Sequence, residues 1–112
     1  MSIPTKTLAN GVEIPAIGMG TWPIFGQALT DTVACAYDAG YRLFDTADNY
    51  YNEADLGNAL QSLSKTRGAK REELFIVTKI SDELYKPGTL GGAPTEAYIF
   101  GKVLRRCKSP IR

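Results

Sequence analysis

The sequence predicts an α/β fold with a parallel sheet, preceded by a small β-hairpin. After residue 16 the chain alternates three times between a short apolar, strand-like run and a segment with helical periodicity. Strict alternation of this kind is typical of parallel sheets covered by helices. The third strand-like run, at residues 74–80 (LFIVTKI), is almost continuously apolar, as expected for a strand with both faces covered.

The N-terminal segment favours a hairpin followed by a first strand. Residues 5–8 and 12–14 flank the dipeptide Asn10-Gly11, which is a strong hairpin signal because both residues tolerate a positive φ. Residues 16–22 form a short apolar run that fits a buried strand. Pro23 and Gly26 mark the loop that this strand enters.

Helical periodicity predicts the next two helices, with a strand between them at residues 41–46. The first helix covers about residues 27–39 and ends at Gly40, a residue type favoured after a helix. The second covers about residues 53–64, and Asn52 is a suitable N-cap. The apolar positions that define the two faces are Leu29, Val33, Ala36 and Tyr37 for the first helix and Leu56, Ala59, Leu60 and Leu63 for the second.

A third helix is predicted after a loop that is rich in glycine and proline. Pro94 suits its first turn and Pro110 stops it. No internal repeat and no low-complexity segment is present. The apolar face of this helix is formed by Phe100, Val103, Leu104 and Cys107.

The charge balance excludes several classes of partner. The 112 residues carry 13 basic and 12 acidic side chains, a net charge of +1. Neither nucleic acid nor an anionic membrane is therefore indicated as a partner. The basic residues between Lys65 and Arg71 are followed by Glu72 and Glu73, and we interpret this stretch as a solvated loop.

The remaining composition indicates a cytoplasmic protein. The N-terminus lacks an apolar signal core, and no apolar run is long enough to cross a bilayer. Cys35 and Cys107 are too few for a disulfide framework, so free thiols are expected. The chain has no histidine, which excludes a histidine-based triad, metal site or acid–base role within it. No metal site is predicted.

Three polar residues fall where a parallel α/β fold places its site. Asp45 ends the second predicted strand, Lys79 ends the third, and Tyr50 lies in the loop after Asp45. Because the carboxyl ends of parallel strands share one edge of the sheet, Asp45 and Lys79 are expected on one rim. A lysine beside a tyrosine stabilises the phenolate, so that Tyr50 could act as a general acid toward a carbonyl oxygen. The alternative is a structural ion pair with a loop tyrosine.

The glycines near the first strand do not make a dinucleotide fingerprint. Gly18 and Gly20 begin the pattern G-x-G-x-x-G, but Pro23 stands at the third glycine position and the run enters a loop rather than a helix. Trp22 follows the strand end. It could be partly buried under its loop or form the wall of a pocket.

Three motifs, in order, resemble those of the aldo-keto reductase family. They cover about residues 5–80, which makes the resemblance specific. The motifs are NGVEIPAIGMGTW at residues 10–22, DAGYRLFDTA at residues 38–47 followed by YxNE and GxAL, and REELFIVTK at residues 71–79.

The resemblance implies part of a (β/α)₈ barrel, with the hairpin closing its bottom and three β-α units following. Residues 1–112 would be the N-terminal part of the barrel, and residues 81–112 match the family only loosely. A complete barrel needs roughly 250 residues.

The resemblance also implies roles for particular residues. Tyr50 matches the catalytic acid, Lys79 the lysine beside it, and Asp45 the aspartate paired with that lysine. Gly20, Thr21, Trp22 and Asp45 match cofactor-binding positions, and Trp22 and Tyr50 match substrate-binding positions. The reaction would be hydride transfer to an aldehyde or ketone from NADPH, with NADH possible as the donor.

The sequence also departs from the family pattern. The family has a catalytic histidine after the fourth strand, and most contacts to the cofactor's phosphates and adenine come from the C-terminal half of the barrel. Neither is present in this chain. We therefore expect little turnover from the isolated chain. The alternative to an enzyme is a catalytically inactive, truncated product that acts, if at all, as a binding or regulatory partner. Oligomeric state and natural substrate stay open.

Overall fold

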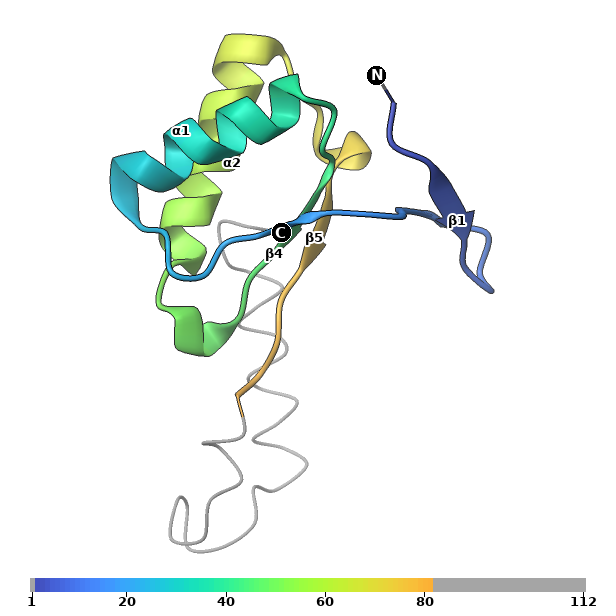
Figure 1. The fold of residues 1–112 in the computed structure, drawn as a ribbon, viewed down its shortest axis with the longest axis horizontal. Helices are drawn as coiled ribbons and strands as arrows, with labels where there is room; N and C mark the ends of the chain where they lie inside the picture. Colours follow the sequence, from blue (N-terminus) through green and yellow to red (C-terminus); the bar gives the residue numbers. More distant parts are fainter. Residues whose placement is uncertain (1, 82–112) are drawn as a thin grey trace, which may run out of the picture.

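The computed structural model describes residues 2–81 and contains a two-stranded hairpin and a three-stranded parallel sheet with helices. In the parallel sheet the strand order is β3-β4-β5. Figure 1 shows the two long helices lying side by side, with the hairpin on the other side of the strands. The elements are β1 (Thr5–Thr7), β2 (Glu13–Pro15), β3 (Met19–Gly20), α1 (Gly26–Asp38), β4 (Leu43–Asp45), the 3₁₀ helix η1 (Asp48–Tyr50), α2 (Glu53–Arg67), the 3₁₀ helix η2 (Arg71–Glu73) and β5 (Phe75–Val77).

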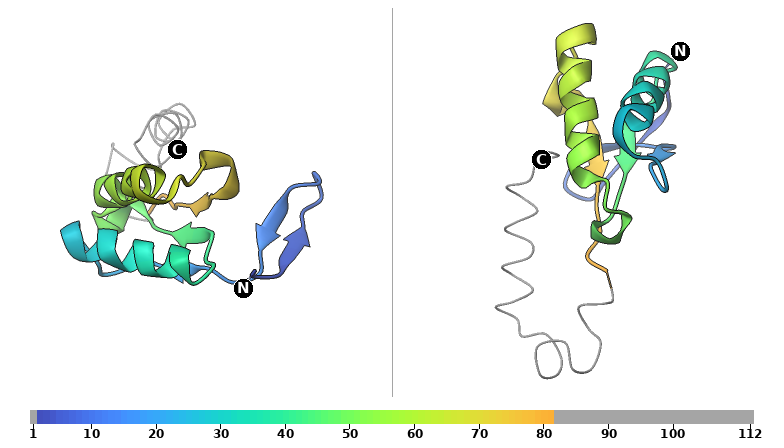
Figure 2. Two further views of the ribbon diagram at one scale, coloured as in Figure 1. Left: turned by 90° about the horizontal axis from the view of Figure 1, so that it is seen from above. Right: turned by 90° about the vertical axis from the view of Figure 1, so that its left-hand side faces the viewer.

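The predicted hairpin is confirmed. Strands β1 and β2 pair antiparallel, and Gly11 has a φ of 85° at the turn. The Asn10 side chain accepts a hydrogen bond from the Val12 amide at 3.1 Å, which closes the turn locally. Figure 2 shows that the hairpin stands apart from α1 and α2, with the parallel strands between them.

The core lies between the sheet and the two helices. Its central side chain is Phe44 of β4, which is fully buried. The apolar faces predicted for the first two helices are confirmed, except that Ala36 and Tyr37 are only partly buried against this core. Within residues 2–81 no helix is long and apolar enough to cross a membrane. The buried apolar residues are Leu29, Val33, Phe44, Leu56, Ala59, Leu60, Leu63, Ala69 and Leu74.

The predicted end of the second helix was too early. Helix α2 continues to Arg67 and ends at Gly68, which has a φ of 66° and donates its amide to the Ser64 carbonyl. Lys65 and Arg67 therefore belong to the last helical turn and not to a solvated loop. Cations there interact favourably with the helix dipole. The Arg67 guanidinium also makes a two-pronged contact with Asp38 of α1, at 3.1 and 2.9 Å.

All three predicted strands of the parallel sheet were too long. The paired residues are 19–20, 43–45 and 75–77, where we expected residues 16–22, 41–46 and 74–80. The third helix predicted from Pro94 lies outside the described residues, as does Cys107. Cys35 is a free, exposed thiol, in agreement with the expectation for that residue.

Gly18 allows the chain before β3 to approach β4 closely. A Cβ atom on Gly18 would lie 2.4 Å from Leu43 Cδ2, 2.8 Å from Leu43 Cβ and 2.9 Å from the Leu43 carbonyl oxygen. All three separations are below van der Waals contact, and two of these atoms cannot rotate away. The first glycine of the G-x-G pair is thus required for packing.

We expect Gly18→Ala to lower the free energy of unfolding by about 1–3 kcal/mol, because β3 must move away from β4. Urea denaturation followed by circular dichroism measures this change. Gly20→Ala is the matched control, since nothing lies within 4 Å of its added Cβ. Equal destabilisation by both variants would contradict the packing explanation.

Candidate active site

The carboxyl end of the parallel sheet brings Asp45 and Lys79 together. Asp45 ends β4 and is paired in register with Val77 of β5, and Lys79 follows two residues later. The Lys79 ammonium lies 2.7 and 2.8 Å from the two carboxylate oxygens of Asp45. The predicted position of this pair on one rim is confirmed. The pair is accessible, with 47% of the Lys79 side chain and 32% of the Asp45 side chain exposed.

Tyr50 faces the same pair. It ends η1, the short helix after β4, and the Lys79 ammonium lies 5.2 Å from the centre of its ring. Partial burial lowers the pKa of Lys79, but hydrogen bonding to Asp45 and the Asp45 charge raise it, and Tyr50 adds to the increase. The net effect raises the pKa of Lys79 above its ordinary value. The cation beside Tyr50 is therefore retained at neutral pH.

Trp22 forms the outer part of the site. Its ring is 56% exposed, so it is not buried under its loop. The Trp22 ring lies 5.5 Å from the Tyr50 ring, tilted by 41°, and 6.1 Å from the Phe25 ring in an edge-on arrangement. These aromatic rings give the rim an accessible apolar surface next to the Tyr50–Lys79 pair.

Gly20 and Thr21 precede Trp22 at the start of the same rim, and only Gly20 has open space beside it. Gly20 pairs with Asp45 in the sheet, and the space where its side chain would lie is open. Thr21 is fully buried. Its hydroxyl and its amide both donate to the Asp45 carbonyl oxygen, at 2.9 and 3.1 Å. Thr21 thus fixes the backbone that carries Asp45.

Asn52, which belongs to the YxNE motif, has a role in the candidate site that the sequence patterns did not reveal. Asn52 occupies the predicted N-cap position of α2, but its side chain makes no cap hydrogen bond. Instead the side chain is fully buried. Its amide nitrogen donates to the Thr21 carbonyl and hydroxyl oxygens, both at 3.0 Å, and to the Ile24 carbonyl at 3.1 Å. Its oxygen accepts from the Thr46 hydroxyl at 2.7 Å.

This network ties the ends of β3 and β4 to the start of α2. Tyr50 and Trp22 lie on the two loops that Asn52 connects, so the network holds both rings in place. Tyr51, between Tyr50 and Asn52, has a φ of 55°, which is uncommon for a residue with a side chain. The contacts of a buried asparagine between two loops can be identified only from the tertiary structure.

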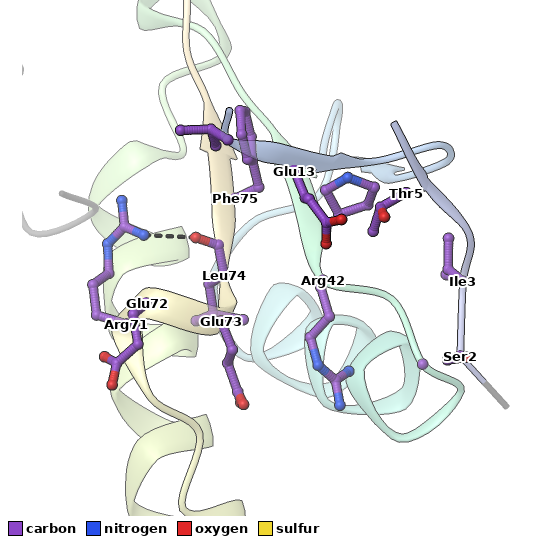
Figure 3. A pocket seen from close by; sticks show the side chains of 13 residues that line it. Ser2, Ile3, Thr5, Glu13, Arg42, Arg71, Glu72, Glu73, Leu74 and Phe75 are labelled. Atoms are coloured by element: carbon purple, nitrogen blue, oxygen red, sulfur yellow. Dashed lines mark hydrogen bonds between the residues drawn. The ribbon is translucent and has the colours of Figure 1, made fainter. Parts of the chain in front are cut away.

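A cavity of about 800 Å³ lies at the other end of the strands. Figure 3 shows it between the hairpin, which contributes Thr5 and Glu13, and the segments before β4 and β5, which contribute Arg42 and Leu74. It is remote from the sheet edge that carries the Asp45–Lys79 pair. The amino-terminal ends of parallel strands in barrels usually serve stability, so we do not place the chemistry in this cavity.

Comparison with known proteins identifies the family. A sequence model described as the Aldo/keto reductase family matches residues 16–106. The NADPH-dependent D-xylose reductase of Candida boidinii is 40% identical over 90 residues, which cover 80% of this chain and 28% of that protein. The NADP-dependent D-sorbitol-6-phosphate dehydrogenase of Malus domestica is 49% identical over 76 residues, covering 68% of this chain and 24% of that protein.

Solved structures show the same likeness. The aldose reductase of Schistosoma japonicum matches 98% of this chain and 33% of its own, with a TM-score of 0.76 and 29% identity. A Bombyx mori aldo-keto reductase in complex with NADP matches 76% of this chain and 30% of its own, with a TM-score of 0.66 and 28% identity. The predicted α/β fold, as part of a (β/α)₈ barrel, is confirmed. The chain spans about a quarter of the length of the Candida boidinii and Malus domestica relatives. It belongs to the aldo/keto reductase family.

Proposed function

We propose that this chain carries the proton-donating part of a site that reduces aldehydes or ketones to alcohols. The contact between the Lys79 ammonium and both Asp45 oxygens, with the Tyr50 ring 5.2 Å away, carries the proposal. Tyr50 would protonate the carbonyl oxygen as it becomes an alkoxide. Lys79 would offset the negative charge left on Tyr50, and Asp45 would hold Lys79 in place.

The cofactor in this proposal is NADPH, with NADH as a possible substitute. When bound, it supplies the hydride. The rim fits a flat ring, because the space beside Gly20 is open and the Trp22 indole is accessible. Gly20, Trp22 and Asp45 would line the nicotinamide end. Thr21, the other residue predicted to bind the cofactor, is fully buried and would act by holding the backbone of Asp45. The relative from Candida boidinii is described as NADPH-dependent and that from Malus domestica as NADP-dependent, which supports this choice.

The substrate in this proposal is a small molecule with an aldehyde or ketone group. Trp22 and Tyr50 would contact it, the first through its exposed ring and the second through its hydroxyl. The two named relatives, a D-xylose reductase and a D-sorbitol-6-phosphate dehydrogenase, support a sugar carbonyl as the substrate class. The proposal includes neither nucleic acid nor a membrane as a partner. We also propose that the protein is cytoplasmic.

We further propose that the 112-residue chain alone has little or no turnover. It contains no histidine, whereas the family resemblance implies a catalytic histidine beyond the third β-α unit. It also spans only 24–28% of the relatives described above. The second candidate function, a non-catalytic binding or regulatory product, is favoured by the same two observations.

We expect NADPH to quench the fluorescence of Trp22 in a saturable way. Trp22 is the only tryptophan, and its ring borders the proposed nicotinamide position. A titration of the purified chain measures the effect, with N-acetyl-tryptophanamide at equal absorbance as the inner-filter control. Gly20→Leu is expected to weaken the quenching by filling the open space. A folded chain without quenching would contradict the proposal. Rapid NADPH oxidation in the presence of an aldehyde would contradict the expected inactivity.

A further inference from the structure

The segment that follows β5 is held by side chains from the segment that carries Tyr50. Glu53, at the start of α2, accepts a hydrogen bond from the Thr78 hydroxyl at 2.8 Å. Asp48, at the start of η1, accepts from the Ser81 amide at 2.9 Å and from the Ser81 hydroxyl at 3.3 Å. The Asp48 amide also donates to the Lys79 carbonyl at 3.0 Å.

These contacts lie on both sides of Lys79 in the sequence. Strand pairing between β4 and β5 ends at Val77, so Lys79 is outside the regular sheet. Thr78 is held by Glu53 and Ser81 by Asp48, while Thr46 donates its amide to the Val77 carbonyl at 2.8 Å. The backbone of Lys79 is thereby fixed relative to residues 46–53, which include Tyr50.

A fixed backbone matters because the Lys79 side chain is long and nearly half exposed. A lysine in such a position loses side-chain entropy when it holds one geometry, and an exposed ion pair offsets little of that cost. Because its backbone is held on both sides, the Lys79 side chain extends toward Asp45 and Tyr50 from a fixed backbone position. Fewer alternative arrangements then compete with the observed one.

We propose that Asp48 and Glu53 are positioning residues that hold the Lys79 ammonium against Asp45 and Tyr50. The inference rests on the proposed function, in which Lys79 acts beside Tyr50. Glu53 contacts Thr78, and Asp48 contacts Ser81 and the Lys79 carbonyl, so the proposed effect on the reaction is exerted through Lys79. Their role is separate from that of Asp45, which contacts the ammonium directly.

The test is a pH titration of the Lys79 ε-carbon by NMR in the full chain labelled with ¹³C-lysine, with the signal assigned from Lys79→Arg. Asp48→Ala is expected to lower the midpoint of the Lys79 titration toward that of an unpaired lysine, because the ammonium leaves Asp45 and Tyr50. Asp48→Asn is expected to keep the original midpoint, since its amide oxygen still accepts from Ser81. Asp31→Ala, which removes an exposed acid of α1 that bonds Gln27, is expected to change nothing.

The Asp48→Asn variant distinguishes an effect of the Asp48 hydrogen bonds on the Lys79 midpoint from an effect of the Asp48 charge. Equal decreases in the midpoint for Asp48→Ala and Asp48→Asn would reveal a charge effect and overturn the proposal, as would an unchanged midpoint in a folded Asp48→Ala chain. Should that variant not fold, the pair Glu53→Ala and Glu53→Gln decides. Glu53→Ala is expected to lower the midpoint and Glu53→Gln to preserve it, and the absence of a decrease in Glu53→Ala overturns the proposal.

This titration needs no cofactor. A chain that does not bind NADPH would contradict the proposed function and leave the NMR result for Lys79 intact. An unchanged Lys79 midpoint in a chain that binds NADPH would overturn the positioning role alone.

Discussion

Replacement of Asn52 by leucine is expected to lower the free energy of unfolding by about 3–5 kcal/mol, because it leaves several buried polar groups without partners. Leucine has a similar size, so lost volume does not explain the expected effect. The Asn52 amide nitrogen bonds two carbonyl oxygens and the Thr21 hydroxyl, and its oxygen satisfies the Thr46 hydroxyl. Thr21 and Thr46 are themselves fully buried, so water cannot readily replace the lost bonds.

Urea denaturation of the purified chain, followed by circular dichroism, measures this change. Asn58→Leu is the matched control, because Asn58 lies further along α2 and is exposed. It is expected to change the free energy of unfolding by less than about 0.5 kcal/mol. A similar loss of stability in both variants would show that the Asn52 network does not hold the two loops together.

The sequence predicted the positions of Asp45 and Lys79 in the candidate site, but it did not predict the contacts of Asn52. Asp45 and Lys79 could be predicted because the end of a strand can be recognised along the sequence. Parallel pairing then brings the carboxyl ends of neighbouring strands to one edge of the sheet. The pairing of Asp45 with Val77 in register then places Lys79 within reach. Asn52 could not be found in this way, since its partners lie up to 31 residues away and come from two loops. Its position before a helix favoured the commoner capping role.

The same distinction explains the errors in the fold. Helix faces follow from a local period, and the buried residues Leu29, Leu56 and Leu63 confirm them. The length of a strand depends on how many of its residues pair with the neighbouring strand. The sequence of one strand alone does not determine this number. Residues 16–22 therefore yielded a pair of only two residues. The role of Gly18 likewise depends on Leu43, which lies on another strand.

Replacement of Phe44 by alanine is expected to lower the free energy of unfolding by about 3–5 kcal/mol. Phe44 is fully buried in the central strand β4 and belongs to the core that α1 and α2 cover. Its removal takes apolar area out of the core and leaves a cavity that neighbouring side chains fill only in part. Because a domain is stable by only about 5–15 kcal/mol, one such change removes a large part of the total.

Urea denaturation monitored by circular dichroism again measures the loss, and two variants test its cause. Phe44→Leu keeps most of the volume and is expected to cost less than half as much. Phe25→Ala removes the same side chain from a position that is 44% exposed and is expected to cost less than Phe44→Ala. Asp45 directly follows Phe44 on β4, so the core residue also fixes the strand that presents Asp45 to Lys79. If Phe44→Ala and Phe25→Ala were equally destabilising, burial between the sheet and the helices would not be the source of the stability that holds this rim.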